Sequence, residues 1–256
     1  SSSCHVNLYF FDDPTTLLSM ALSANRYANN AQGKPMPYCT EFRLDSHDGH
    51  TLSAYLACPD TPAIGGIILL HEIFGITAQM RELAEHFAAI GYKAIIPALF
   101  DRIERGIGLD YGETDRGRAL ADACDQQHLL LDLQAAIDAL ATDNTALVGY
   151  CWGGGIAYFA ACHLPVNAGV AFYGTRLPRY LHQQPNCPFQ FHFGEQDNAI
   201  SAEVIAQVRA VNADSDIYIY QQAGHAFANH ARPSFHAASA ALAEQRLVNF
   251  LGLTKN

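Results

Sequence analysis

A glycine-rich stretch at residues 149–154, Gly-Tyr-Cys-Trp-Gly-Gly, constrains the fold of this chain more than any other segment. Residues 145–148 before it are apolar and partly β-branched, which predicts a short buried strand. Residues 156–162 after it are apolar and compatible with a helix. The pattern therefore predicts a strand, a tight turn and a helix, with Cys151 at the apex of the turn.

Cys151 has the surroundings that a nucleophile requires. The apex residue of such a turn is held in a strained conformation that lifts its side chain above the sheet, and the flanking glycines keep other side chains away. The N-terminus of the following helix directs N–H groups and partial positive charge at the sulfur, which favours the thiolate. The alternative is a glycine-rich turn around a buried, inert cysteine, and the hexapeptide alone does not exclude it.

Two further candidates follow predicted strands. Asp197 comes shortly after the apolar run 188–193, and His225 shortly after the run 217–220. The chain order of nucleophile, acid and histidine is that of the α/β-hydrolases. Taken singly, Asp197 is also compatible with a helix-capping acid, and His225 with an ordinary core or surface histidine.

The remaining periodicity predicts the α/β-hydrolase fold, a doubly wound and mainly parallel sheet with helices on both faces. A hairpin begins it, with an antiparallel edge. The expected strands are 40–44, 51–57, 64–70, 92–96, 145–148, 166–172, 188–193 and 216–220. The expected helices are 78–90, 115–141, 156–162, 201–211 and 233–251. We assign residues 39–256 to this domain and residues 1–38, with a short helix at 17–27, to an N-terminal extension.

Composition excludes several classes of protein. The chain has 256 residues, half of them hydrophobic and 16% charged, which fits one large globular domain. A net charge of −10 without a basic patch excludes a typical nucleic-acid-binding protein. The seven cysteines include no CxxC pair and the histidines have no metal-type spacing, so we expect no metal and no cofactor. Without a transmembrane-length run or a signal-peptide pattern, we expect a cytoplasmic monomer with no membrane partner.

The loop 71–75, His-Glu-Ile-Phe-Gly, follows the predicted strand 64–70. In the α/β-hydrolase fold this loop supplies one N–H group of the oxyanion hole, and the residue after the nucleophile supplies the other. Those groups are the backbone N–H groups of Ile73 and Trp152. Glu72 is predicted to point toward Cys151, as a base for the thiol or as a lock on its resting state; the alternative is a loop acid that caps the next helix.

Four motifs together resemble the dienelactone hydrolases, or carboxymethylenebutenolidases. They are 71–75, 149–154, 194–197 and 223–228, and the resemblance extends from about residue 40 to the end of the chain. It implies a Cys151–His225–Asp197 triad and an active-site glutamate at Glu72. It also implies an arginine that binds the substrate carboxylate, a position that Arg102 matches.

Each candidate substrate-binding residue has an alternative interpretation. Arg102 can instead pair with a neighbouring acid, Asp101 or Glu104. Phe227 is expected to line the substrate pocket, with core packing as the alternative. A second arginine of the family, about four residues after the histidine, is replaced by Asn229, with Arg232 close by.

Three functions remain open at this stage. The first is hydrolysis of a small ester or lactone that bears a carboxylate, through a thioester intermediate. The second is a general carboxylesterase or thioesterase without that preference, which the missing second arginine favours. The third is a non-enzymatic protein in which the cysteine serves redox sensing or ligand binding.

Overall fold

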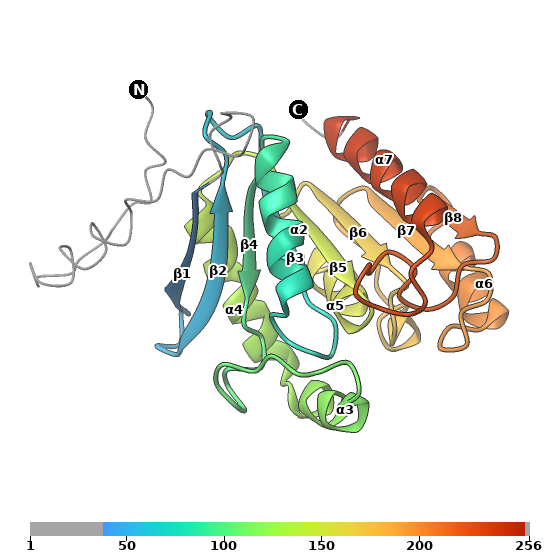
Figure 1. Ribbon diagram of the computed structural model, residues 1–256, viewed down its shortest axis with the longest axis horizontal. Helices are drawn as coiled ribbons and strands as arrows, with labels where there is room; N and C mark the ends of the chain where they lie inside the picture. Colours follow the sequence, from blue (N-terminus) through green and yellow to red (C-terminus); the bar gives the residue numbers. More distant parts are fainter. Residues whose placement is uncertain (1–37, 254–256) are drawn as a thin grey trace, which may run out of the picture.

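A computed structural model describes residues 38–253, and in this range the chain forms one mixed sheet in the order β1-β2-β4-β3-β5-β6-β7-β8 (Figure 1). The pairs β1–β2 and β2–β4 are antiparallel and the other neighbours are parallel. The strands are β1 (Tyr38–Asp45), β2 (Thr51–Cys58), β3 (Gly66–Leu70), β4 (Lys93–Pro97), β5 (Thr145–Tyr150), β6 (Ala168–Phe172), β7 (Phe189–Gly194) and β8 (Asp216–Tyr220). The predicted hairpin and the mainly parallel sheet are confirmed; the predicted helix at 17–27 lies outside the described residues.

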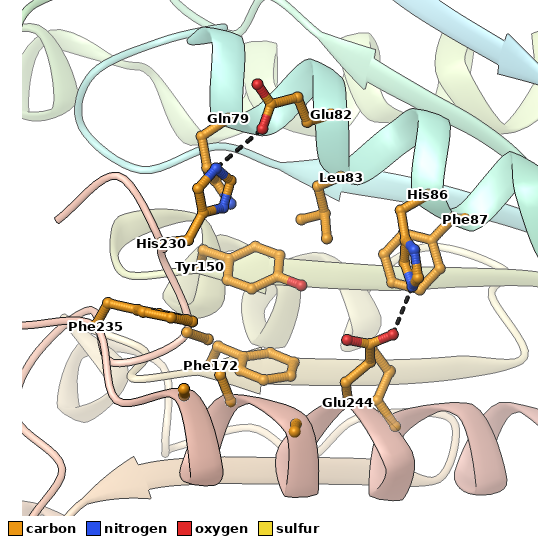
Figure 2. Close-up of a pocket in the computed structure, with 15 residues that line it drawn as sticks. Gln79, Glu82, Leu83, His86, Phe87, Tyr150, Phe172, His230, Phe235 and Glu244 are labelled. Carbon is orange, nitrogen blue, oxygen red and sulfur yellow. Dashed lines mark hydrogen bonds and ion pairs between the residues drawn. The ribbon is translucent and has the colours of Figure 1, made fainter. Parts of the chain in front are cut away.

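Helices cover both faces of the sheet, with α2 and α7 on the face toward the viewer in Figure 1 and α4 and α5 behind it. The helices are α2 (Ala78–Ala89), α3 (Thr114–Ala123), α4 (Gln126–Leu140), α5 (Trp152–Ala161), α6 (Ala202–Val211) and α7 (Ala237–Leu253), with a 3₁₀ turn η1 (Leu177–Arg179). Between α2 and α7 the sheet carries a cavity walled by Tyr150 and Phe172 (Figure 2). In the described range no helix is long and apolar enough to cross a membrane.

The predicted helix at residues 115–141 is wrong, because the structure has two helices there. The sequence predicts one continuous helix over residues 115–141, but the helix is interrupted between α3 and α4 because Cys124 is extended, with φ −67° and ψ 125°. Asp125 then caps α4, and its side chain accepts hydrogen bonds from the N–H groups of Gln127 and His128. Aspartate is a favoured N-cap residue, so the break has a local cause that periodicity alone does not show.

The register of the parallel strands sets where the functional loops meet. Leu70 of β3 lies opposite Gly149 of β5, and Tyr150 lies opposite Phe172 of β6. The carboxyl ends of β3, β5, β7 and β8 therefore share one edge of the sheet, and each is followed by one of the sequence motifs.

Candidate active site

Cys151, His225 and Asp197 form a hydrogen-bonded chain at this edge. Cys151 follows β5, Asp197 follows β7 and His225 lies in the loop after β8. The His225 Nε2 atom is 3.2 Å from Cys151 Sγ, and its Nδ1 atom is 2.9 Å from Asp197 Oδ2. Asp197 and Cys151 lie 28 and 74 positions before His225 in the chain, and the structure brings all three together.

The turn that carries Cys151 has the strained geometry expected of it. Cys151 has φ 54° and ψ −116°, a conformation that non-glycine residues rarely adopt. A Cβ atom on Gly149 would lie 2.0 Å from the Gly153 carbonyl oxygen, and one on Gly153 would lie 2.2 Å from the Leu70 oxygen. Both positions therefore require glycine because backbone passes too close for any side chain.

His225 is held in its charged form by its two partners. Burial alone would lower the pKa of His225, but the hydrogen bonds to Asp197 and Cys151 outweigh it and raise the pKa to about 10. The Asp197 side chain is fully buried, and its second carboxylate oxygen accepts a hydrogen bond of 2.7 Å from the Ala199 N–H group. With both ring nitrogens protonated, His225 can donate through Nε2 to the Cys151 sulfur.

Glu72 is buried at the same edge and has a neutral partner. The side-chain amide of Asn229 donates to Glu72 Oε2 at 3.1 Å, and the same nitrogen is 3.2 Å from the Tyr111 hydroxyl. Arg232 Nη1 is 4.0 Å from that carboxylate oxygen and stacks over the ring of Tyr111. Burial raises the pKa of Glu72, and the nearby charges of Arg232 and His225 offset this only in part.

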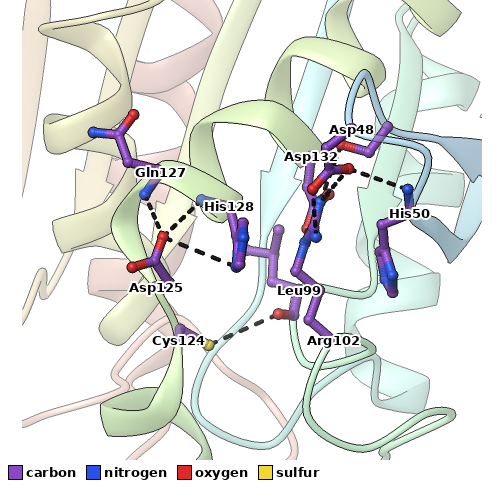
Figure 3. Close-up of polar contacts among 10 residues, drawn as sticks. Asp48, His50, Leu99, Arg102, Cys124, Asp125, Gln127, His128 and Asp132 are labelled. Atoms are coloured by element: carbon purple, nitrogen blue, oxygen red, sulfur yellow. Dashed lines mark hydrogen bonds and ion pairs between the residues drawn. The ribbon is translucent and has the colours of Figure 1, made fainter.

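The side chain of Arg102 is bound by acidic residues of two other elements. Its guanidinium donates to both Asp132 oxygens at 2.7 and 2.9 Å and to both Asp48 oxygens at 2.8 and 3.0 Å (Figure 3). These bonds hold the pKa of the Asp48 carboxyl well below its usual range. Arg102 therefore ties the β1–β2 turn to α4, and its partners are not Asp101 or Glu104, the neighbours named as alternatives.

The other predicted residues, Phe227, Trp152 and Ile73, are buried. Phe227 is fully buried and packs on Tyr173 and Tyr220, with ring centroids 5.5 and 4.9 Å apart, so it belongs to the core. Trp152 is the first residue of α5, so its N–H group belongs to the helical turn that lacks intrahelical acceptors. Ile73 lies in the loop after β3, largely buried.

Sequence reasoning missed His71. Its Nδ1 atom donates to the Glu72 carbonyl oxygen at 2.6 Å, and its ring lies against Phe100 and Trp152. Burial lowers the pKa of His71 to about 4, so the ring stays neutral. The carbonyl of Glu72 and the N–H of Ile73 belong to one trans peptide and point in opposite directions, so this bond fixes where the Ile73 N–H is directed. The adjacency of His71 and Glu72 was the only signal in the sequence.

No group of three or more histidine, cysteine or acidic side chains that could hold a metal occurs in the range 38–253. The arrangement at the edge of the sheet is a thiol, an imidazole and a carboxylate in hydrogen-bond contact, set on an α/β-hydrolase fold. This combination defines a hydrolase of the α/β class.

Comparison with known proteins identifies the family. Residues 52–254 match the model of the dienelactone hydrolase family, and the chain belongs to it. It is 34% identical over 221 residues to a carboxymethylenebutenolidase of Pseudomonas putida, covering 81% of this chain and 94% of the relative. A putative carboxymethylenebutenolidase of Yersinia pestis is also 34% identical, covering 83% and 87%.

A solved structure agrees. The putative dienelactone hydrolase of Klebsiella pneumoniae superposes with a TM-score of 0.76 at 27% identity, covering 84% of this chain and 98% of that one. The predictions of a hydrolase of the dienelactone hydrolase kind and of its fold are therefore confirmed.

A substitution tests the placement of Arg102. Arg102→Ala leaves Asp132, whose side chain is 1% exposed, as an unpaired buried carboxylate, so the free energy of unfolding should fall by on the order of 3 kcal/mol. The KM for an ester that bears a carboxylate should not change. Urea unfolding and steady-state kinetics measure the two effects.

Arg105→Ala is the control, because Arg105 is 56% exposed and 4.0 Å from Asp101. It should cost less than about 1 kcal/mol. A raised KM in Arg102→Ala with unchanged stability would return Arg102 to a role in substrate binding.

Proposed function

We propose that this protein hydrolyses a small ester or lactone through a thioester on Cys151. The hydrogen-bonded chain from Cys151 through His225 to Asp197, on a strained turn at the N-terminus of α5, is the observation that supports it. The relatives named carboxymethylenebutenolidase support the substrate class. The monomeric state and the cytoplasmic location stay predictions.

The proposed reaction has two halves. The Cys151 thiolate attacks the carbonyl carbon, and the carbonyl electrons move onto its oxygen. When the tetrahedral species collapses, the bond to the leaving oxygen breaks and His225 Nε2–H gives that oxygen its proton. His225, now neutral, takes a proton from water, whose oxygen attacks the thioester and releases the thiolate. Asp197 holds the imidazole through Nδ1 and stabilises its charged form in both halves.

The N–H groups of Ile73 and Trp152 would bind the negative oxygen. His71 supports this proposal because its bond to the Glu72 carbonyl fixes the direction of the Ile73 N–H. Removing a donor of this kind typically costs on the order of 3 kcal/mol of transition-state stabilisation.

Arg232 is the candidate for binding a substrate carboxylate. Its side chain is 24% exposed, it stacks over Phe74 and Tyr111, and it lies beside Glu72. The general carboxylesterase stays as the second candidate, because Asn229 occupies the place of the family's second arginine and Arg102 is bound to Asp48 and Asp132.

Kinetics with two matched esters test the function. Cys151→Ala should lower kcat by on the order of a thousandfold for both 4-nitrophenyl butyrate and mono-4-nitrophenyl succinate, because the nucleophile is gone. Arg232→Gln should raise the KM of the anionic succinate ester about tenfold and leave the butyrate unchanged. The exposed Arg118 supplies the control, Arg118→Gln.

Equal effects of Arg232→Gln on both esters would favour the general carboxylesterase. Turnover that survives in Cys151→Ala would reject the thioester mechanism.

The role of Glu72 is tested by the reactivity of Cys151 toward iodoacetamide. Burial raises the pKa of Glu72. Below that pKa the Glu72 carboxyl group is neutral, as a glutamine side chain is. Above it the negative carboxylate disfavours a negative charge on the Cys151 sulfur. The ratio of the alkylation rate of Glu72→Gln to that of wild type should be near one in acid and rise about tenfold as the pH increases through that pKa. Glu113→Gln is the control, because the Glu113 side chain is 40% exposed and pairs with Arg116. A ratio that falls below one with rising pH would show that Glu72 acts as a base for the thiol.

Two substitutions of His71 test the positioning of the Ile73 N–H. His71→Leu should lower kcat by about tenfold or more, with little change in KM, because the oxyanion forms only in the transition state. His71→Asn keeps an N–H donor near the Nδ1 position and should recover much of the loss. Equal losses in the two variants, or a loss confined to KM, would contradict the positioning role.

A further inference from the structure

A cavity of about 400 Å³ lies between α2 and α7, on the face of the sheet opposite α5 (Figure 2). Its volume is in the range of small-molecule sites, about 300–1,000 Å³. Large apolar and aromatic side chains from α2, the sheet, the loop before α7 and α7 itself form much of its lining: Leu83, Phe87, Tyr150, Phe172, Phe235 and Leu247.

Two histidine–glutamate pairs flank this cavity. His230 Nε2 lies 2.9 Å from Glu82 Oε2, joining the loop before α7 to α2, and His86 Nε2 contacts Glu244 Oε1, joining α2 to α7. All four side chains are about half exposed, so the pairs are open to solvent and to a ligand.

The charge of the lining limits what can bind. Its charged and titratable members are the two glutamates, the two histidines and Tyr150, and it contains no lysine or arginine. Burial raises the pKa of Tyr150, so its hydroxyl stays neutral. The lining therefore carries a charge between −2, with both histidines neutral, and 0, with both charged. Because the lining is never positive in this range, it does not attract an anion.

We propose that this cavity is a second binding site, for a small organic cation with an aromatic or short alkyl body. Leu83, Phe235 and Leu247 form an apolar lining that buries the body of the ligand, with the stacked rings of Tyr150 and Phe172 as its floor. Glu82 and Glu244 supply the opposite charge, and the Tyr150 hydroxyl is turned toward the cavity as a hydrogen-bonding group.

This site is separate from the triad, and the proposal does not depend on the proposed function. Cys151, His225 and Asp197 are not among the lining residues. The two sites share a wall, because Tyr150 directly precedes Cys151 and packs near Tyr173, which in turn contacts the His225 ring. Their charged surroundings also differ, since Arg232 lies beside Glu72 and no arginine lines the cavity.

Calorimetric titration of the intact protein with three matched probes tests the site. Phenethylamine is the cation, 2-phenylethanol the neutral analogue and 3-phenylpropionate the anion, and none of them is an ester. We expect phenethylamine to bind at least about tenfold more tightly than the alcohol, and the anion to bind least. Equal binding of the amine and the alcohol would overturn the assignment of a cation.

Matched variants place the ligand. Ala240 lines the cavity, so Ala240→Phe should fill it and weaken phenethylamine binding at least about tenfold. Ala238→Phe, on the same helix but outside the lining, should bind as wild type does. Circular dichroism and the alkylation rate of Cys151 confirm that each variant is folded. Equal binding by the two variants would overturn the location.

The two carboxylates are tested together. The double variant Glu82→Gln and Glu244→Gln keeps the size of both side chains and should reduce the preference for the amine over the alcohol to about one. A preference that persists would contradict the role given to the glutamates. Loss of phenethylamine binding after alkylation of Cys151 would show that the amine occupies the triad and would reject the second site.

Discussion

The close packing of backbone around Cys151 is the constraint on which the site depends. Gly149, Gly153 and the end of β3 approach so closely that no side chain fits between them. This contact holds Cys151 at φ 54°, a conformation that typically costs about 1–3 kcal/mol and persists only where the surrounding structure enforces it. The sulfur is thereby fixed above the sheet, next to the N-terminus of α5 and within reach of His225.

The register of the parallel strands brings the other residues of the site close to Cys151. Because β3, β5, β7 and β8 end at one edge, their loops deliver Glu72, Cys151, Asp197 and His225 to the same place. Hydrogen-bond partners then set the surroundings of His225 and Glu72. The bonds to Asp197 and Cys151 raise the pKa of His225, and the side-chain amide of Asn229 donates to Glu72. The His71 ring is neutral, so its hydrogen bond to the Glu72 carbonyl oxygen orients the loop without adding a charge.

Much of this arrangement is predictable from the sequence, for a physical reason. Cys151, Asp197 and His225 each follow an apolar strand, and parallel strands place such residues together whatever their separation along the chain. Arg102 also follows a strand, but its side chain turns to Asp48 and Asp132, which are 54 and 30 residues away, and local pattern does not encode that choice. The direction of the His71 ring and the Asp125 cap that divides α3 from α4 depend on single hydrogen bonds. The cavity depends on the spacing between α2 and α7, which no sequence motif specifies.

Mass spectrometry of the acylated protein tests directly whether Cys151 is the nucleophile. The protein is mixed with 4-nitrophenyl acetate, quenched in acid during turnover and digested. If Cys151 is the nucleophile, an acetyl group is expected on the peptide that carries Cys151, removable by neutral hydroxylamine as a thioester is. An acetyl group found on another residue, or turnover with no acyl intermediate under conditions where deacylation is slow, would contradict it.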